Sequence, residues 1–347
     1  MSTLTAFTEV PVVDVSGLLG DDPLEHSRVA QELGRAAREV GFLYVTGTGL
    51  PPELAEELLR VTQAFFALPH EDKMRTWIGR STNHRGYVPV GEEVFAGGTQ
   101  DLKEAFDLGA DLPADHPAVA GARMLGPNQW PDVPGFAAAC TAWYDAVLTL
   151  GRRLLSGFAL ALGEPGDAFD RYVTQPPSQL RLIHYPYDPD ARDAVGIGAH
   201  TDYECFTLLL PTAPGLEVLN GAGEWIDVPP LDGALVVNVG DILETWTNGR
   251  FVATTHRVRK VAEERWSFPL FFNVDADTVV APLPQFVGAG ELARAPLVAG
   301  DHLFAQTAQT FSYLRRRLES GELVLPDGSL GLSSFGQEAL QGSGRPA

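Results

Sequence analysis

Seven short β-rich runs follow one another from Leu180 to about Val274, and this series constrains the fold more than any other feature. The runs are LRLIHY, FTLLL, LEVL, WIDV, ALVVNVG, FVATTHRV and WSFPLFF, each bounded by Gly, Pro, Asn or Asp. A parallel sheet would need a helix-length crossover between successive strands, and the intervals between these runs show no such helical pattern. The series therefore predicts an antiparallel sandwich or jelly roll.

The region before these runs has a mixed α/β character. Residues 10–14 predict a strand, and residues 23–40 predict a helix with apolar side chains on one stripe. A second strand is expected at residues 42–45 and a second helix at residues 52–66. Residues 79–134 are rich in Gly, Pro and polar side chains, which predicts long loops and short strands of the kind that often face substrates.

Two more helices flank the β-rich region. Residues 136–162 carry an apolar stripe typical of a core-packing helix, and residues 305–318 predict a final helix before a Gly/Ser-rich tail. The expected fold class is mainly β with flanking helices. We expect four segments without internal repeats, packed as one unit: 1–135 α/β with substrate loops, 136–177 packing helix and connection, 178–280 β core, 281–347 C-terminal helix and tail.

The charge balance excludes several kinds of partner. Lys and Arg number 25 against 45 Asp and Glu, and the net charge of −20 would repel nucleic acid and anionic lipid. No signal peptide or apolar run of membrane-spanning length is evident, so we expect a cytoplasmic protein. Cys140 and Cys205 are 65 residues apart and fit no zinc or disulfide spacing, so we expect two buried free thiols.

The strongest chemical signal is a His-x-Asp pair, His200 and Asp202, followed 54 residues later by His256. In an extended segment, residues i and i+2 project to the same side, so this imidazole and carboxylate can face one point. Two imidazoles and a carboxylate with open positions are typical of non-haem iron(II) oxygenases. Taken alone, a His-x-Asp pair more often marks a solvated turn, and a single strand His is more often a core residue.

An Arg-x-Ser pair in the next predicted strand strengthens the metal-site prediction. Arg265 and Ser267 follow nine and eleven residues after His256 and share one face of the next predicted strand. A guanidinium and a neighbouring hydroxyl make a strong clamp for a carboxylate. The alternative for Arg265 is a surface ion pair with Glu263 or Glu264.

Together these motifs resemble the isopenicillin N synthase-like branch of the iron(II) and 2-oxoglutarate-dependent dioxygenases. The resemblance extends over nearly the whole chain through VPVVDVSGLLG, AAREVGFLYVTGTGL, RGY at 85–87, KEAFD at 103–107 and LRLIHYP. Where relatives carry Asn-His-Gly in the turn after the second strand, this chain has TGTG at 46–49. The resemblance implies a double-stranded β-helix (jelly-roll) core.

The resemblance also implies roles for individual residues. His200, Asp202 and His256 would bind iron(II), Arg265 and Ser267 would bind the distal carboxylate of 2-oxoglutarate, and Tyr185 would add a hydroxyl near it. Many relatives have an Asn where this chain has Ile183, so one polar contact is missing. His184 should point away from the cavity, because it is adjacent to Tyr185 in a strand.

The implied activity is oxidation of a small organic molecule at an unactivated C–H bond, with hydroxylation as the default and a place in secondary metabolism. Fe(II), 2-oxoglutarate and O2 would be needed, ascorbate should stimulate, and the protein should be a monomer or weak homo-oligomer. Arg85 could hold a substrate carboxylate or only tie down a loop. The expected substrate-facing residues are Asn83, Arg85, Tyr87, Phe95, Phe106, Leu182, Phe206 and Phe272, and Phe304, Phe311 and Tyr313 could cover the cavity mouth.

Three alternatives remain open from the sequence. An oxidase of the same fold would take all its electrons from the substrate and need no 2-oxoglutarate, and an Arg-x-Ser pair does not separate it from an oxygenase. A rarer variant would fragment 2-oxoglutarate itself to ethylene. A cupin-like binding or zinc-dependent module would have no redox role.

Overall fold

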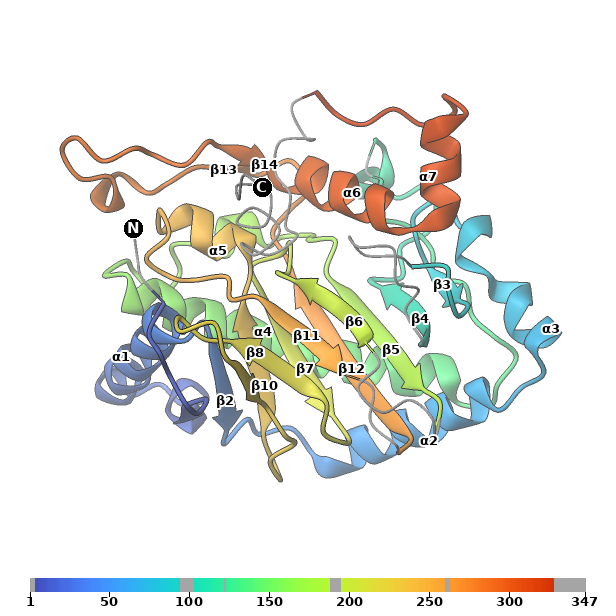
Figure 1. Cartoon of the computed structure of the whole chain (residues 1–347), viewed down its shortest axis with the longest axis horizontal. Coiled ribbons are helices and arrows are strands. Elements are labelled where there is room, and N and C mark those ends of the chain that lie inside the picture. The colour runs from blue at the N-terminus through green and yellow to red at the C-terminus, as the bar shows by residue number, and fades with distance from the viewer. Residues whose placement is uncertain (1–3, 94–102, 122, 188–194, 260–262, 328–347) are drawn as a thin grey trace, which may run out of the picture.

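The computed structural model describes residues 4–93, 103–121, 123–187, 195–259 and 263–327, and two β-sheets form its centre (Figure 1). The larger sheet is mostly antiparallel and joins the N-terminal strands to the β-rich region. Its strands in spatial order are β1 (Val12–Asp14), β2 (Phe42–Thr46), β10 (Leu235–Val239), β7 (Phe206–Pro211), β12 (Arg265–Phe272), β5 (Gln179–Tyr185), β4 (Glu104–Gly109) and β3 (Gly86–Val88).

The smaller sheet lies against one face of the larger one and completes the predicted jelly roll. Its strands in order are β6 (Val195–His200), β11 (His256–Arg259), β8 (Leu216–Leu219) and β9 (Trp225–Asp227). β6 was not among the predicted strands, because its sequence VGIGAH interrupts the apolar pattern with Gly196 and Gly198. The predicted run FVATTHRV is a strand only from His256 onward.

Helices cover the other face of the larger sheet. They are α1 (Pro23–Glu39), α2 (Pro52–Phe66) and α4 (Phe136–Ala161), and the expected boundaries agree with these to within one residue. α1 begins where the Asp22 side chain accepts a hydrogen bond from the Leu24 amide, with Pro23 in the first turn. The predicted stripe of α4 is buried against the sheet, as are the free thiols Cys140 and Cys205.

The C-terminal helices lie across one end of the two sheets (Figure 1). The single helix expected at residues 305–318 is wrong, because the chain forms α6 (Ala299–Thr310) and α7 (Ser312–Glu319) with a break at Phe311. Phe311 is extended, with φ −90° and ψ 125°, and it forms an isolated β-bridge with Glu93. Pairing with this distant segment therefore interrupts the helix at Phe311.

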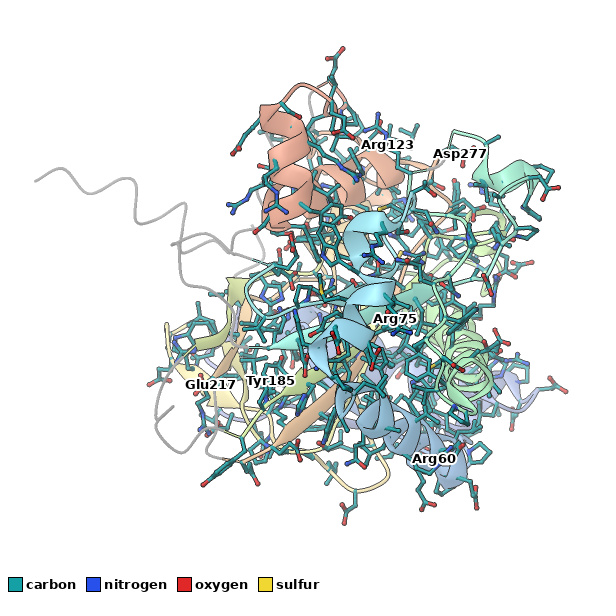
Figure 2. The ribbon with its side chains drawn as sticks, turned by 90° about the vertical axis from the view of Figure 1, so that its right-hand side faces the viewer. Arg60, Arg75, Arg123, Tyr185, Glu217 and Asp277 are labelled. Atoms are coloured by element: carbon teal, nitrogen blue, oxygen red, sulfur yellow. The ribbon has the colours of Figure 1, made fainter. Side chains whose placement is uncertain are left out.

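Shorter elements complete the described chain. α3 (His70–Lys73) and α5 (Asp241–Trp246) are single short helices, and β13 (Val279–Val280) pairs with β14 (Leu297–Val298). Figure 2 shows Arg123 at the end that carries α6 and α7, and Arg60 of α2 at the opposite end. Within the described residues, no helix is long and apolar enough to cross a membrane.

The contact between α4 and the larger sheet gives a stability test at Gly151. A Cβ added there would lie 2.4 Å from the Phe272 ring, although alanine is the better helix former. We expect Gly151→Ala to lower the free energy of unfolding by about 1–3 kcal/mol, the usual effect of overpacking a core. Urea unfolding would measure it, with Arg153→Ala on the exposed side of α4 as the control. Equal stability of Gly151→Ala and the parent would contradict this packing.

Candidate active site

The two predicted histidines meet through strand pairing. His200 is the last residue of β6 and His256 is the first of β11, and these two residues are direct partners in the antiparallel register. Their ring centroids lie 4.3 Å apart. Asp202 lies beyond the end of β6, so it is not in the extended segment that we expected, yet its Oδ1 is 3.7 Å from His200 Nε2 and 3.6 Å from His256 Nε2.

Backbone carbonyls fix the orientation of both imidazoles. His200 Nδ1 lies 2.8 Å from the Gly198 carbonyl oxygen, and His256 Nδ1 lies 3.2 Å from that of Thr254. A carbonyl can only accept, so each Nδ1 carries the proton and each Nε2 keeps its lone pair. This is the arrangement in which histidine binds a metal, with the second nitrogen held by the protein.

The Asp202 carboxylate is held in the same way. Its Oδ2 accepts hydrogen bonds from Asn238 Nδ2, at 2.7 Å, and from the Thr207 hydroxyl. Burial alone would raise the pKa of Asp202, but the two imidazoles and these two hydrogen bonds keep the pKa below its ordinary value. The carboxylate is therefore ionised, and Oδ1 is left to face the histidines.

The three side chains fit one divalent cation. His200 Nε2, His256 Nε2 and Asp202 Oδ1 face one another, and one ligand atom from each residue lies within 4.8 Å of the others. Burial and the neighbouring His256 lower the pKa of His200 to about 4, so its imidazole is neutral at pH 7. Two neutral nitrogens and one carboxylate on one side of a site leave further coordination positions open.

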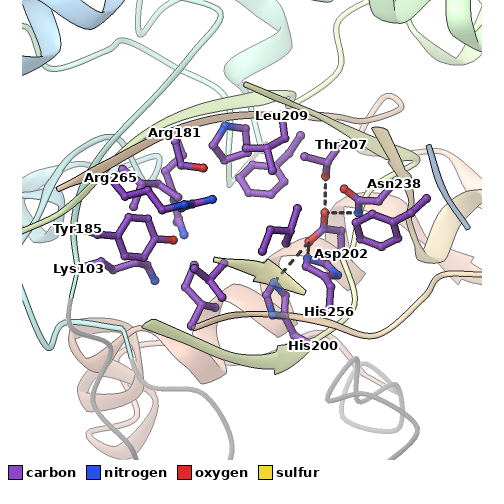
Figure 3. A pocket seen from close by; sticks show the side chains of 18 residues that line it. Lys103, Arg181, Tyr185, His200, Asp202, Thr207, Leu209, Asn238, His256 and Arg265 are labelled. Atoms are coloured by element: carbon purple, nitrogen blue, oxygen red, sulfur yellow. Dashed lines mark hydrogen bonds and ion pairs between the residues drawn. The ribbon is translucent and has the colours of Figure 1, made fainter. Parts of the chain in front are cut away.

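A first cavity extends from these residues along β5 and β12 (Figure 3). Alternate residues of both strands face it, because strand side chains alternate between the two faces of a sheet. From β5 they are Arg181, Ile183 and Tyr185; from β12 they are Arg265, Ser267, Pro269 and Phe271.

Arg265 lies across the cavity from the histidines and is 1% exposed (Figure 3). Its Nε donates to the Ala213 carbonyl at 3.2 Å, whereas Nη1 and Nη2 have no hydrogen-bond partner within the described chain. Burial lowers the pKa of this guanidinium, and the nearby Tyr185 partly opposes that shift. A buried cation with two free donors is costly unless a ligand pairs with it, and a carboxylate fits that fork.

The surface ion pair considered for Arg265 is not present. Glu264 instead lies 2.9 Å from His184 Nε2, on the opposite face of the sheet. His184 stacks on Trp266 there, with ring centroids 4.1 Å apart, while Tyr185 faces the cavity. The expected opposition of His184 and Tyr185 is therefore present in the structure.

A second cavity lies on the other side of His200 and Asp202 and reaches the C-terminal helices. His200, Asp202, Arg181 and Phe271 border both cavities. The remaining lining residues of this second cavity are His84, Glu93, Gln179, Tyr203, Glu204, Leu303, Thr307, Thr310 and Phe311.

A buried ionic network that the sequence reasoning missed stands between the two cavities. Arg181 makes a paired contact with Asp107, through Nε at 2.7 Å and Nη2 at 2.9 Å, and its Nη1 reaches Glu93 at 3.1 Å. Lys103, which borders the first cavity, donates to Glu93 at 2.6 Å. Burial would raise the pKa of Glu93, but the two cations lower it to about 2. Strand alternation from Tyr185 could have identified Arg181.

The residues expected to face the substrate lie elsewhere in the structure. Phe106, Leu182, Phe206 and Phe272 belong to the core between the larger sheet and the helices. They were chosen for their apolar side chains, but alternation places them on the opposite face from Tyr185 and Ser267. Phe311, considered as a cover for the cavity mouth, does line the second cavity.

The polar residues that we expected to face the substrate instead form hydrogen bonds that hold the protein structure together. The Arg85 guanidinium donates to the carbonyls of His84, at 3.0 Å, and Met124, at 2.8 Å, which favours the loop-anchoring alternative. Asn83 donates to the Pro127 carbonyl, and the Tyr87 hydroxyl donates to Glu104. None of these three lines either cavity, and Phe95 lies outside the described residues.

A jelly roll that brings two histidines and one carboxylate together beside a buried arginine defines the class of mononuclear non-haem oxygenases. The superfamily model of 2OG-Fe(II) oxygenases matches residues 176–274, and a model of the N-terminal region of non-haem dioxygenases in morphine synthesis matches residues 10–133. The chain belongs to the 2OG-Fe(II) oxygenase superfamily. It is an Fe(II)- and 2-oxoglutarate-dependent oxygenase that acts on small molecules.

Individual relatives support this assignment along nearly their whole length. The 2-oxoglutarate-Fe(II) type oxidoreductase hxnY of Emericella nidulans is 35% identical over 91% of this chain and 94% of its own. A homoarginine-6-hydroxylase of Oryza sativa is also 35% identical, over 88% of this chain and 98% of its own. A Neurospora crassa protein solved in complex with alpha-KG and thymine has a TM-score of 0.74 and 25% identity, covering 92% of this chain and 100% of that one.

The hydrogen bond from Asn238 to Asp202 Oδ2 can be tested by measuring metal affinity. We expect Asn238→Ala to weaken Fe(II) binding about 10–100-fold, the usual effect of losing a hydrogen bond to a metal ligand. Anaerobic equilibrium dialysis would measure the affinity. The control is Asn220→Ala, because buried Asn220 bonds only to Phe7 and to residues of its own turn, away from the site. Unchanged affinity in Asn238→Ala would show that Thr207 alone orients the carboxylate.

Proposed function

We propose that His200, Asp202 and His256 bind the iron, and that Arg265, Ser267 and Tyr185 bind the distal carboxylate of 2-oxoglutarate in the first cavity. The observation that carries the proposal is the pair of partnerless terminal nitrogens of Arg265, which is fully buried in the same cavity as the three ligands. Ser267 faces that cavity from the same strand, and the Tyr185 ring lies 4.8 Å from the Arg265 guanidinium carbon.

Bound iron supplies the oxidising chemistry with dioxygen and 2-oxoglutarate. The protein's side chains bind, orient and exclude water. Arg265 would fix the far end of 2-oxoglutarate and so direct its 2-oxo acid end toward the metal-binding residues. Ile183, Leu209 and Val258 would keep water from this cavity, since all three line it with apolar atoms.

We further propose that the second cavity holds the molecule to be oxidised, because it borders His200 and Asp202 from the side opposite Arg265. Hydroxylation at a C–H bond is the expected reaction, and several relatives are named as hydroxylases. Cytoplasmic location and a monomeric or weakly self-associating state belong to the same proposal. Succinate formed from 2-oxoglutarate in the presence of Fe(II) and ascorbate would separate this function from that of a same-fold oxidase.

The metal assignment predicts that His256→Ala loses iron. Removing one of three ligand side chains leaves two, which cannot complete the site. Iron content after anaerobic reconstitution and desalting should fall to the level of metal-free protein, and turnover should be lost. His26→Ala in α1 is the control, because the His26 side chain contacts the Gly20 carbonyl and lines neither cavity. Full iron content and activity in His256→Ala would exclude this ligand set.

The cosubstrate assignment predicts that Arg265→Ala raises the apparent KM for 2-oxoglutarate by at least about 30-fold. Truncating one partner of a buried charge pair costs about 2–5 kcal/mol. Arg265→Lys should recover only part of this loss, because an ammonium cannot form the two-pronged contact. Arg257→Ala on β11 is the control, since Arg257 pairs with Glu217 at 2.6 Å and lines neither cavity. An unchanged KM in Arg265→Ala would remove Arg265 from the cosubstrate site.

A further inference from the structure

The second cavity contains a glutamine amide that no group in the described part of the chain satisfies. Gln179 is the first residue of β5, is 7% exposed and lines this cavity, and its side chain makes no hydrogen bond within the described chain. Buried amides are normally hydrogen-bonded, because burying one without a partner costs about 1–3 kcal/mol. An amide donates and accepts at once, so it is complementary to a ligand that carries both an N–H and a carbonyl-like acceptor.

Two further polar groups border the same space. Nε2 of His84 lies 3.8 Å from Asp107, too far for a hydrogen bond, while Nδ1 is occupied by the Tyr313 hydroxyl at 2.7 Å. The His84 backbone has φ 60°, a left-handed conformation that is strained for histidine and often occurs at functional sites. Glu204 also lines the cavity and has no basic side-chain partner within the described residues.

Every described cation that borders this cavity is already paired with carboxylates of the protein. Arg181 holds Asp107 and Glu93, and Glu93 in turn binds Lys103. A carboxylate offers only acceptor atoms, and in this space it would find no described protein cation free to pair with it, which makes its burial costly. The protein side chains that line the cavity therefore do not favour an anionic group.

The helical wall adds acceptors and apolar surface. Leu303, Thr307 and Thr310 of α6 face the cavity at helical spacing, followed by Phe311 at the break. The Thr307 hydroxyl donates to the Leu303 carbonyl at 2.8 Å, and that of Thr310 donates to the Thr307 carbonyl at 3.2 Å. Each hydroxyl thus keeps only its lone pairs for a ligand, so this wall too is suited to N–H donors.

We propose that this cavity selects a substrate whose reacting end carries N–H groups of the amide, urea or guanidine type and no carboxylate, with Gln179 as a specificity-determining residue. The inference rests on the proposed function, because it places the oxidised molecule in this cavity. Gln179 binds the nitrogen group, while the threonine acceptors on α6 take its remaining N–H bonds. Phe271 and Leu303 supply the apolar contacts for the carbon chain.

Three small probes of matched length test the class of substrate: pentanamide, n-butylguanidinium and pentanoate. Each is titrated anaerobically into the Fe(II)- and 2-oxoglutarate-loaded protein, and the change in the visible charge-transfer band reports binding without turnover. We expect pentanamide and n-butylguanidinium to bind at least about ten-fold more tightly than pentanoate. The two nitrogen probes also distinguish a neutral from a cationic substrate group.

The role of Gln179 is tested with Gln179→Leu, which keeps the volume and removes the amide. Pentanamide affinity should fall about ten-fold, the effect of one buried hydrogen bond, while 2-oxoglutarate affinity stays within about two-fold. Gln175→Leu, in a groove away from both cavities, is the matched control. If Gln179→Leu loads iron poorly, ligand-observed NMR compares pentanamide binding to the metal-free variant and to the metal-free parent protein.

Two kinds of failure are distinguishable. If the charge-transfer band never forms with Fe(II) and 2-oxoglutarate, the proposed function is wrong. If the band forms but pentanoate binds as tightly as the nitrogen probes, or if no probe binds, the inference is overturned and the proposed function stands. Equal pentanamide affinity in Gln179→Leu and the parent would overturn the role of Gln179.

Discussion

Strand alternation is the constraint on which the rest of this structure depends. Along β5 and β12, one set of side chains packs against α4, while the other set builds the cavity that runs from Arg265 to the metal-binding residues. A shift of register by one residue would place Leu182 in the cavity and the charged Arg181 against the helix. The hydrophobic pattern of the core therefore also fixes the position of every polar group in the site.

The first cavity contains buried charged groups whose burial costs free energy, and the surrounding sheets keep the protein folded despite this cost. Arg265 is buried with no carboxylate partner in the described chain, and the ionised Asp202 carboxylate is buried beside the two histidines. Each charge on its own disfavours folding, and the surrounding sheets supply the hydrophobic energy that tolerates it. The network around Arg181 differs, because each of its charges is satisfied by the protein. Within the described chain, the terminal nitrogens of Arg265 remain without a protein partner.

The sequence predicted that His200, Asp202 and His256 would lie together, and it predicted most helices, because these features depend on short patterns and on residue chemistry. It did not predict β6, whose glycines mask the strand pattern, nor the break at Phe311, which depends on pairing with Glu93 far away in the chain. The prediction that Phe206 faces the cavity is wrong, because aromatic character alone does not reveal which face of a sheet a side chain occupies. Arg181 was within reach, since it lies four residues before Tyr185 on the same face.

The break at Phe311 has a consequence for how this enzyme can diversify. The wall formed by α6 comes from the end of the chain, whereas the residues proposed to bind iron and 2-oxoglutarate lie on or beside strands that are complete before α6 begins. Phe311 and Ser312 contact the Glu92–Glu93 segment through backbone atoms, while buried side chains of α6 and α7 such as Leu303 and Tyr313 pack into the core. The C-terminal segment thus builds one wall of the second cavity without supplying any residue proposed to bind iron or 2-oxoglutarate, so substitutions on its cavity face would change the molecule bound while those residues stay the same.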